Sequence, residues 1–308
     1  MLLFISVCSS AIVYAVSVMY AGIGEIFSQR AGIMNLGLEG IMLMGAVSGY
    51  MAAVYTASLA VAFIVVLLTG CAFGVIFAFL TVTLKADQTV CGMAMLTFGS
   101  GLSGFIGKNV TSVAANLKFE KFDIPMLSNI PIIGPIFFHQ NFLVYLMYLI
   151  IPLSIFYIYK TRPGMKLRAL GENPAVLDSA GNNVFAMRYF YVMFGCMMTA
   201  LSGACVSLAY TNFWSSGMTG GKGWIAVALV TFSSWNPTVL VLGALLFGGI
   251  SILGANLQIY LPGIPSQIYS MLPYFATVIA FIISTGNFRK KHTSEPAALC
   301  IPYDRESR

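Results

Sequence analysis

One carboxylate, that of Glu39, stands within a long apolar stretch of the sequence, residues 32–55. A carboxylate at the centre of a bilayer costs about 3 kcal/mol by insertion scales unless it is paired or hydrated, so it usually faces a bundle interior or a water-filled cavity. Asn35 stands four residues earlier and shares a face with Glu39 if the stretch is helical. The pair could line a pathway for a polar solute, cap a helix broken at Gly37 and Gly40, or hold this segment against its neighbours.

Three short motifs suggest catalysis or nucleotide binding, and each lacks something that the chemistry needs. Gly99–Gly104 matches the dinucleotide fingerprint GxGxxG but lies inside an apolar stretch rather than after a strand. Its last part resembles the GxSG of intramembrane serine proteases, yet neither histidine, His139 nor His292, lies well within a span to activate the serine. Gly220–Lys222 is similar to a P-loop, but Gly223 stands where Ser or Thr is required. We therefore expect that none of these motifs makes the chain an enzyme.

Cysteine and histidine usage predicts neither a metal site nor a disulfide framework. The chain has six cysteines and two histidines, and no cysteine pair has CxxC spacing. We expect the cysteines to be small apolar packing residues, with no metal or cofactor bound to this chain.

The composition limits the class of protein that can position these residues. Of 308 residues, 58% are hydrophobic and only 8% are charged, and the mean hydropathy is +0.87. Soluble domains carry about 25% charged residues, so a soluble enzyme and a disordered chain are excluded. The net charge of +6 reflects basic cytoplasmic loops rather than nucleic-acid binding. We predict an all-α, polytopic membrane helical bundle.

Since a helix needs about 20 apolar residues to cross the hydrocarbon core, the hydropathy pattern predicts about nine spans, with eight or ten as alternatives. The predicted spans are residues 2–22, 32–55, 57–84, 90–107, 141–159, 189–211, 224–234, 236–257 and 267–286. They form a transmembrane domain over residues 1–288, followed by a cytoplasmic tail, residues 289–308. A Pro/Gly-rich apolar run, Ile130–Ile136, is too short to cross and predicts a re-entrant or interfacial segment within residues 108–140.

The basic residues orient this bundle, because cytoplasmic loops carry an excess of Lys and Arg. With the loop 160–188 in the cytoplasm, the N-terminus faces out and the C-terminus faces in. Twelve basic residues then lie inside: Arg30, Lys85, Lys160, Arg162, Lys166, Arg168, Arg188, Arg289, Lys290, Lys291, Arg305 and Arg308. Four lie outside: Lys108, Lys118, Lys121 and Lys222.

The cytoplasmic loop 160–188 contains a complete signature of a short helix. Asn173 is a good N-cap, Pro174 suits the first helical position, and Gly181 suits a left-handed C-cap. A helix of about two turns is unstable alone in water, so its apolar side needs a partner surface. From spacing alone, that surface could be another protein or the membrane itself.

Three separated segments resemble the permease subunits of ABC importers of the ribose-type and branched-chain amino acid family. They are the loop segment 168–181, the segment 24–40, and a late segment made up of residues 223–226, 235–237 and 242–249. Within this family, the chain most resembles the nucleoside permeases that accompany basic-membrane-protein lipoproteins.

The resemblance implies a set of partners and a role for the short helix. Two permease subunits, identical or paralogous, would form the pathway in the cell membrane. ATP and Mg²⁺ would bind a separate cytoplasmic ATPase, and an extracytoplasmic substrate-binding lipoprotein would deliver the solute. The ATPase would dock on the coupling residues Gly171, Glu172, Asn173, Pro174, Val176, Leu177, Asp178 and Gly181. With Val176, Leu177 and Ala180 facing the ATPase, Leu177→Arg should uncouple transport without unfolding the chain.

Four residues are candidates for lining the pathway: Asn35, Glu39, Asn212 and Trp214. Asn212 and Trp214 could also be interfacial anchors, because Trp is common where helices leave the membrane. The alternative function is an ion-coupled secondary transporter of a small solute. It is disfavoured because such transporters usually carry several intramembrane ionisable residues, and the predicted spans contain essentially one.

Overall fold

A computed structural model describes residues 2–111, 118–125, 127–128, 130–131, 133–261, 263, 265–288 and 295–305. The α-helices are α1 Leu2–Arg30, α2 Leu38–Thr56, α3 Leu59–Ala78, α4 Gln88–Gly107, α5 Ile133–Phe137, α6 Phe142–Lys160, α7 Arg162–Glu172, α8 Pro174–Ser179, α9 Val184–Cys205, α10 Lys222–Phe232, α11 Pro237–Tyr260 and α12 Ser266–Phe288. The remaining elements are the π-helical turns η1 Phe79–Thr83 and η3 Val206–Tyr210, the 3₁₀ turn η2 Lys108–Val110, and the strands β1 Lys121–Asp123 and β2 His139–Asn141.

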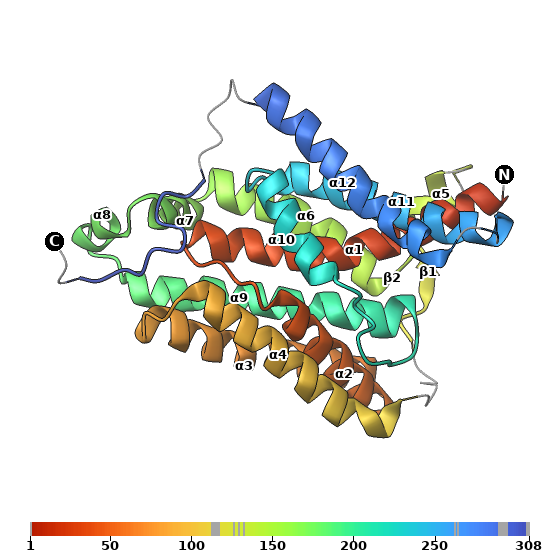
Figure 1. Ribbon diagram of the computed structural model, residues 1–308, viewed down its shortest axis with the longest axis horizontal. Helices are drawn as coiled ribbons and strands as arrows, with labels where there is room; N and C mark the ends of the chain where they lie inside the picture. The colour runs from red at the N-terminus through yellow and green to blue at the C-terminus, as the bar shows by residue number, and fades with distance from the viewer. Residues whose placement is uncertain are drawn as a thin grey trace.

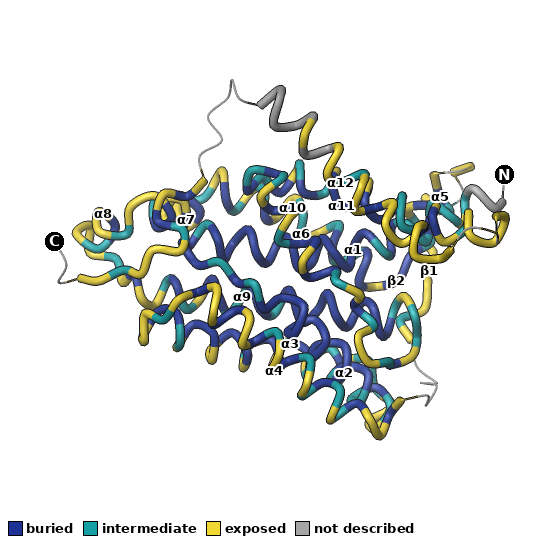
Figure 2. Tube along the Cα trace, in the orientation of Figure 1, coloured by how far each residue is buried: buried dark blue, intermediate teal, exposed yellow. Residues whose placement is uncertain are grey.

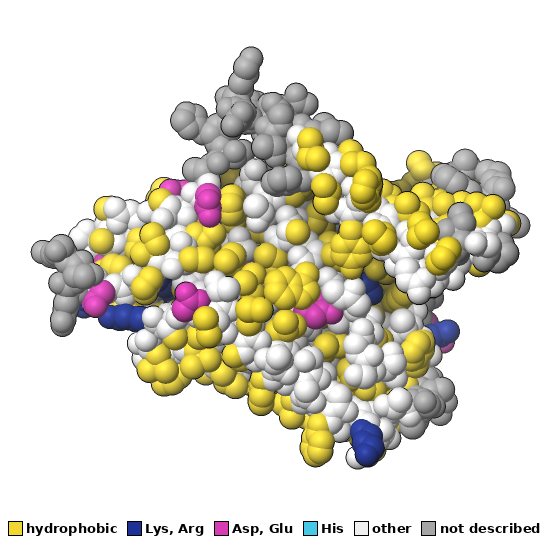
Figure 3. All heavy atoms as spheres, in the orientation of Figure 1, with side chains coloured by type: hydrophobic (Ala, Val, Ile, Leu, Met, Phe, Trp, Pro, Cys, Tyr) yellow, Lys and Arg dark blue, Asp and Glu magenta, His cyan; other side chains and the backbone are white. Residues whose placement is uncertain are grey.

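Helices α1 and α9 form the centre of the bundle. Helices α2, α3 and α4 lie on one side of this pair, and α6, α10, α11 and α12 lie on the other (Figure 1). Figure 2 shows the central helices buried along most of their length, whereas the outer helices expose one side. Those exposed sides are apolar over much of the face drawn in Figure 3. Such a surface suits contact with lipid.

Close contacts at glycines bring α9 against α2 and α3. A Cβ atom added at Gly45 would lie 2.2 Å from the carbonyl oxygen of Ala200 on α9. At Gly70, an added Cβ would lie 2.7 Å from the carbonyl oxygen of Cys196, also on α9. Gly45 and Gly70 therefore serve helix crossings within the chain, as small residues commonly do in membranes.

The structure has a helix at each of the nine predicted spans, with two differences near the start of the chain, and the number of helices that cross the membrane stays a prediction. Helix α1 continues past residue 22 to Arg30, and residues 31–37 form a buried non-helical turn before α2. Among the described residues, seven helices are long and apolar enough to cross a membrane. Helix α10 has only 11 residues and covers about 16 Å, so it cannot cross alone.

The turn after α1, the turn between α3 and α4, and the α7–α8 segment lie together at one end of the bundle, here called the α8 end (Figure 1). The described basic residues predicted to share a side, Arg30 and Lys85 among them, thus lie at one end. The basic residues Arg289, Lys290, Lys291 and Arg308 lie outside the described residues. That the α8 end faces the cytoplasm stays a prediction.

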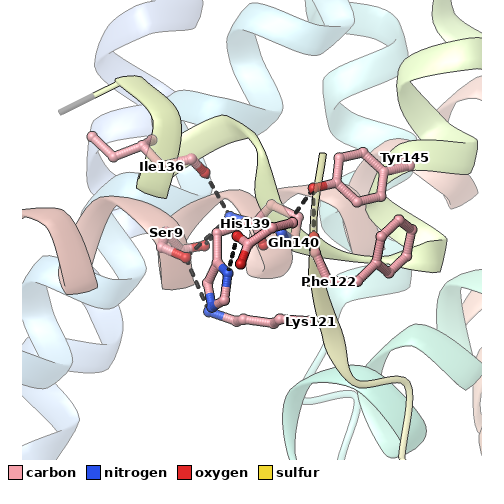
Figure 4. A network of polar contacts seen from close by, with 8 residues as sticks. Ser9, Lys121, Phe122, Ile136, His139, Gln140 and Tyr145 are labelled. Carbon is pink, nitrogen blue, oxygen red and sulfur yellow. Dashed lines mark hydrogen bonds and ion pairs between the residues drawn. The ribbon is translucent and has the colours of Figure 1, made fainter. Parts of the chain in front are cut away.

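At the opposite end, a two-stranded ribbon of β1 and β2 is tied to the start of α1 (Figure 4). Lys121 donates a 3.0 Å hydrogen bond to the Ser9 hydroxyl, and the buried Gln140 side chain donates to the same oxygen at 3.0 Å. The Tyr145 hydroxyl accepts from the Gln140 N–H and donates to the Phe122 carbonyl. These bonds fix the ribbon as a rigid cap on this end of the bundle.

The apolar run Ile130–Ile136 contributes to this cap rather than crossing the bundle. Its last residues form the single-turn helix α5, which packs beside α1, and Ile132 lies outside the described residues. At Gly134, an added Cβ would lie 2.2 Å from the Ser128 carbonyl oxygen, so only glycine fits this turn.

Candidate functional site

The Glu39 carboxylate lies in the first turn of α2 and holds the start of α10. It accepts hydrogen bonds from the Thr219 hydroxyl at 2.5 Å, the Gly221 N–H at 2.8 Å and the Gly223 N–H at 2.7 Å. Glu39 is 9% exposed. The first N–H groups of a helix have no partner within the helix, so Glu39 supplies the acceptor that the start of α10 lacks.

Two helix N-termini converge on this carboxylate. A helix N-terminus carries a partial positive charge, and the first turns of α2 and α10 both lie at this carboxylate. The approach is close, because a Cβ added at Gly223 would lie 2.5 Å from the backbone nitrogen of Glu39. Among the three roles left open by the sequence, these contacts fit a residue that fixes one segment against its neighbour.

Asn35 does not share a helical face with Glu39, because it lies in the non-helical turn before α2. Its side-chain oxygen accepts a 2.8 Å hydrogen bond from the Gly37 N–H. Its backbone N–H donates at 2.9 Å to Glu25, a buried carboxylate on α1 that also accepts from Gln29 at 2.8 Å. Asn35 therefore shapes the turn between α1 and α2.

Glu25 and its partners are functional candidates that the sequence reading missed, because it ended the first span at residue 22. Gln29 accepts a 2.7 Å hydrogen bond from the Trp235 indole, and Arg30 donates at 2.8 Å to the Trp235 carbonyl. The turn between α10 and α11 is thereby fixed to the end of α1. The Glu25 and Gln29 side chains, four residues apart within continuing apolar sequence, were the available signal for a longer helix.

Lys222 is buried, contrary to its predicted place in an outer loop. It is the first residue of α10 and is 5% exposed. Its ammonium group lies 4.4 Å from the centroid of the Tyr14 ring and 5.6 Å from that of Tyr210, within cation–π range. Together with Glu39, it gives the start of α10 one positive and one negative side chain.

The remaining pathway candidates, Asn212 and Trp214, lie in the connection between η3 and α10. Trp214 is 1% exposed and packs against the end of α4, where a Cβ on Gly107 would overlap the indole. It is therefore a packing residue rather than an interfacial anchor. Asn212 adopts φ +59°, and its side-chain oxygen is buried without a hydrogen-bond partner among the described residues. No described hydrogen bond joins Asn35, Glu39, Asn212 and Trp214 into one polar cluster.

The short helix α8 forms as its sequence signature predicts. The Asn173 side-chain oxygen accepts hydrogen bonds from the Ala175 N–H at 3.1 Å and the Val176 N–H at 3.2 Å. Pro174 occupies the first turn, and Gly181 adopts φ +80° just beyond the helix. The sequence reading missed only the amphipathic helix α7 directly before it, capped by Thr161.

The two apolar residues at the middle of α8 point in different directions. Leu177 is 6% exposed and packs into the hydrophobic core, whereas Val176 is 61% exposed. The expectation that Leu177 faces a partner is therefore wrong, and Val176 is the large apolar side chain that α8 presents outward. Asp178 is partly buried, and Gly171 packs so closely that an added Cβ would lie 2.4 Å from the Arg30 carbonyl oxygen.

Among the described residues, no group of three or more His, Cys, Asp or Glu side chains could hold a metal ion. All six cysteines are free, and five of them lie on helices of the bundle.

The sequence matches the family described as branched-chain amino acid transport system, permease component, over residues 7–282. A putative glucose ABC transporter permease of Haloferax volcanii is 33% identical over 95% of each chain. A nucleoside ABC transporter permease of Lactococcus lactis is 32% identical over 91% of this chain and 92% of its own. A guanosine ABC transporter permease of Bacillus subtilis is 31% identical over 96% and 95%. No solved structure gives a significant match.

The family match and the alignments with the permease relatives both cover nearly the whole chain, and the pattern of long apolar helices agrees with them. The protein is a multi-pass protein of the cell membrane and a transport subunit rather than an enzyme. Proteins of this kind work with a separate ATPase and a substrate-binding protein. The chain belongs to the family of branched-chain amino acid transport system permease components, as a permease subunit of an ABC transporter.

Proposed function

We propose that this permease imports a nucleoside, driven by a cytoplasmic ATPase that binds at α8. The geometry of α8 is the observation that supports this ATPase-binding site. Its N-cap and its buried Leu177 anchor the helix, while Val176 is exposed at the end of the bundle. A short capped helix with an exposed valine fits a groove of a partner protein. Under this proposal, the α8 end is cytoplasmic and the ribbon end faces the binding protein.

The proposed substrate is neutral, and the start of α10 supports this. Helix N-termini in membranes often bind anionic groups of a substrate. Here the carboxylate of Glu39 occupies that position, and Lys222 adds a compensating positive charge. With one side chain of each sign, the start of α10 carries no net charge for an ionised solute to neutralise. Both nucleosides and glucose are neutral, and two of the three relatives described above carry nucleoside or guanosine in their names.

The proposed assembly contains a second permease subunit, identical or paralogous, and an extracytoplasmic substrate-binding lipoprotein. Neither ATP nor Mg²⁺ binds this chain in the proposal, since both act on the ATPase. The energy for transport then enters through α8 rather than through an ion bound within the membrane.

Reconstitution tests the proposal. The permease, its second permease subunit, the ATPase and the binding protein are placed in proteoliposomes, and uptake of radiolabelled guanosine, uridine and glucose is measured. We expect ATP-dependent nucleoside uptake that persists when an ionophore collapses the membrane potential. Glucose uptake without nucleoside uptake would contradict the proposal that the substrate is a nucleoside. Uptake that needs an ion gradient and no ATP would favour the ion-coupled transporter.

A further inference from the structure

Residues 295–305, here called the strap, run across the α8 end of the bundle, beside α7 and α8 (Figure 1). Pro296 and Ala298 are buried, so this segment is packed rather than lying free on the surface. The sequence reading treated it only as part of a cytoplasmic tail.

On one side, the strap contacts α8. The Tyr303 hydroxyl donates a 3.0 Å hydrogen bond to the Asp178 carboxylate, and Arg305 forms a 2.9 Å ion pair with the same oxygen. The Tyr303 ring also packs against Phe185 at the start of α9, with ring centroids 6.0 Å apart. Asp178 thus joins the short helix to the strap.

On the other side, the strap is bonded to the ends of α1 and α7. The Ala298 N–H donates at 2.7 Å to the Gly171 carbonyl, and the Cys300 N–H donates at 3.2 Å to the Gly32 carbonyl. An ion pair of 2.7 Å between Asp304 and Lys85 also connects the strap to the turn between α3 and α4.

The strap also covers a buried cation on α9. The Arg188 guanidinium is 1% exposed, and its described hydrogen-bond acceptor is the Ile301 carbonyl, at 3.4 Å. A buried charge needs hydrogen-bonding partners, so the strap and α9 stabilise one another here. The strap therefore links α8 to α1 and α9, the two helices at the centre of the bundle.

We propose that the strap is a positioning element that transmits movement of α8 to α1 and α9 during transport. The inference rests on the proposed docking of the ATPase at α8. A helix of six residues is not stable alone, so a force applied at Val176 would tilt α8 unless its other side were held. The Asp178–Tyr303 contact holds that side and connects it to the central helices.

The test compares uptake per ATP hydrolysed in the complete reconstituted complex, together with hydrogen exchange of the α8 amides. In Tyr303→Phe the hydrogen bond to Asp178 is lost, and we expect uptake per ATP to fall by about fivefold. Asp178→Ala and replacement of residues 295–305 by a Gly/Ser sequence should reduce it further. In all three variants, the α8 amides should exchange faster while the ATPase stays bound.

A matched control changes a neighbouring polar group without touching the strap contacts. Glu295→Gln changes an exposed residue at the start of the strap. It should keep normal uptake per ATP. If the permease with the Gly/Ser replacement does not assemble into the complex, the two point variants at Tyr303 and Asp178 decide whether the inference holds.

Normal uptake per ATP and unchanged α8 exchange in the strap variants would overturn the inference. Val176→Arg separates this result from failure of the proposed function. If Val176→Arg abolishes transport while the strap variants behave normally, only the strap inference is wrong. If Val176→Arg also transports normally, the ATPase does not couple through α8, and both are wrong.

Discussion

The Glu39 carboxylate accepts a 2.7 Å hydrogen bond from the backbone N–H of Gly223, 184 residues later in the chain. This contact joins the first turn of α2 to the first turn of α10. Because α10 is too short to cross the membrane alone, its position depends on such contacts at its ends. The junction places both helix starts inside the bundle. A pathway for a polar solute there would run along non-helical backbone, and that backbone needs hydrogen-bond partners.

Glu39→Gln should destabilise the permease. The amide group keeps one acceptor oxygen but turns an NH₂ donor toward N–H donors of α10, so we expect a loss of about 2 kcal/mol. Thermal unfolding in detergent measures this, with Thr219→Val as a milder change that removes one of the three donors. Unchanged stability combined with weaker substrate binding would instead place Glu39 on the pathway.

Gly223→Ala should separate α2 from α10. The new methyl group would lie 2.5 Å from the Glu39 nitrogen, a backbone atom that cannot move aside cheaply. Expression and thermal stability should fall sharply. The matched control is Gly249→Ala on α11, where no atom lies within 4 Å and helix propensity favours alanine by about 1 kcal/mol. Equal behaviour of the two variants would contradict the close junction.

Asn173→Ala should weaken coupling through loss of the α8 N-cap. Its side-chain oxygen satisfies two N–H groups of a six-residue helix, and such a cap contributes about 1 kcal/mol. We expect lower uptake per ATP and faster exchange of the α8 amides, with recovery in Asn173→Ser, which can also cap. A serine variant as defective as the alanine variant would point to a direct contact by Asn173 instead.

Val176→Arg and Leu177→Arg should differ in kind. Val176 is exposed, so its arginine variant should fold, insert and fail to bind the ATPase. Leu177 is buried, so its arginine variant should be destabilised and poorly expressed, because an unpaired charge is costly inside a core. Co-purification of the ATPase and thermal unfolding separate the two effects. A stable Leu177→Arg permease without bound ATPase would restore the expectation from sequence.

Local signals in the sequence were sufficient to predict helix α8. The N-cap Asn173, the following proline and the C-terminal Gly181 act within a few residues of the helix, so their geometry could be predicted. Which side of α8 is buried could not be predicted, because a helix of six residues has too few positions to show a periodic apolar face. For this reason the structure buries Leu177, which was expected to face the ATPase together with Val176.

The buried ionisable residues depended on long-range partners and were largely missed. Glu25 is satisfied by a turn ten residues away, Lys222 by Tyr14 on another helix, and Arg188 by the strap 113 residues later. Hydropathy reports only the average polarity of a segment, so it ended the first span too early and put Lys222 in a loop. The helices at the predicted spans could be located because each long helix has an apolar surface of its own, whereas the number that cross the membrane stays a prediction.

The most direct test of the account is guanosine uptake into proteoliposomes that contain the complete transporter, compared between the natural permease and Val176→Arg. We predict ATP-dependent uptake by the natural protein, insensitive to an ionophore, and no uptake by a Val176→Arg permease that is folded and inserted. ATP-dependent uptake at an equal rate by both proteins would contradict coupling through α8.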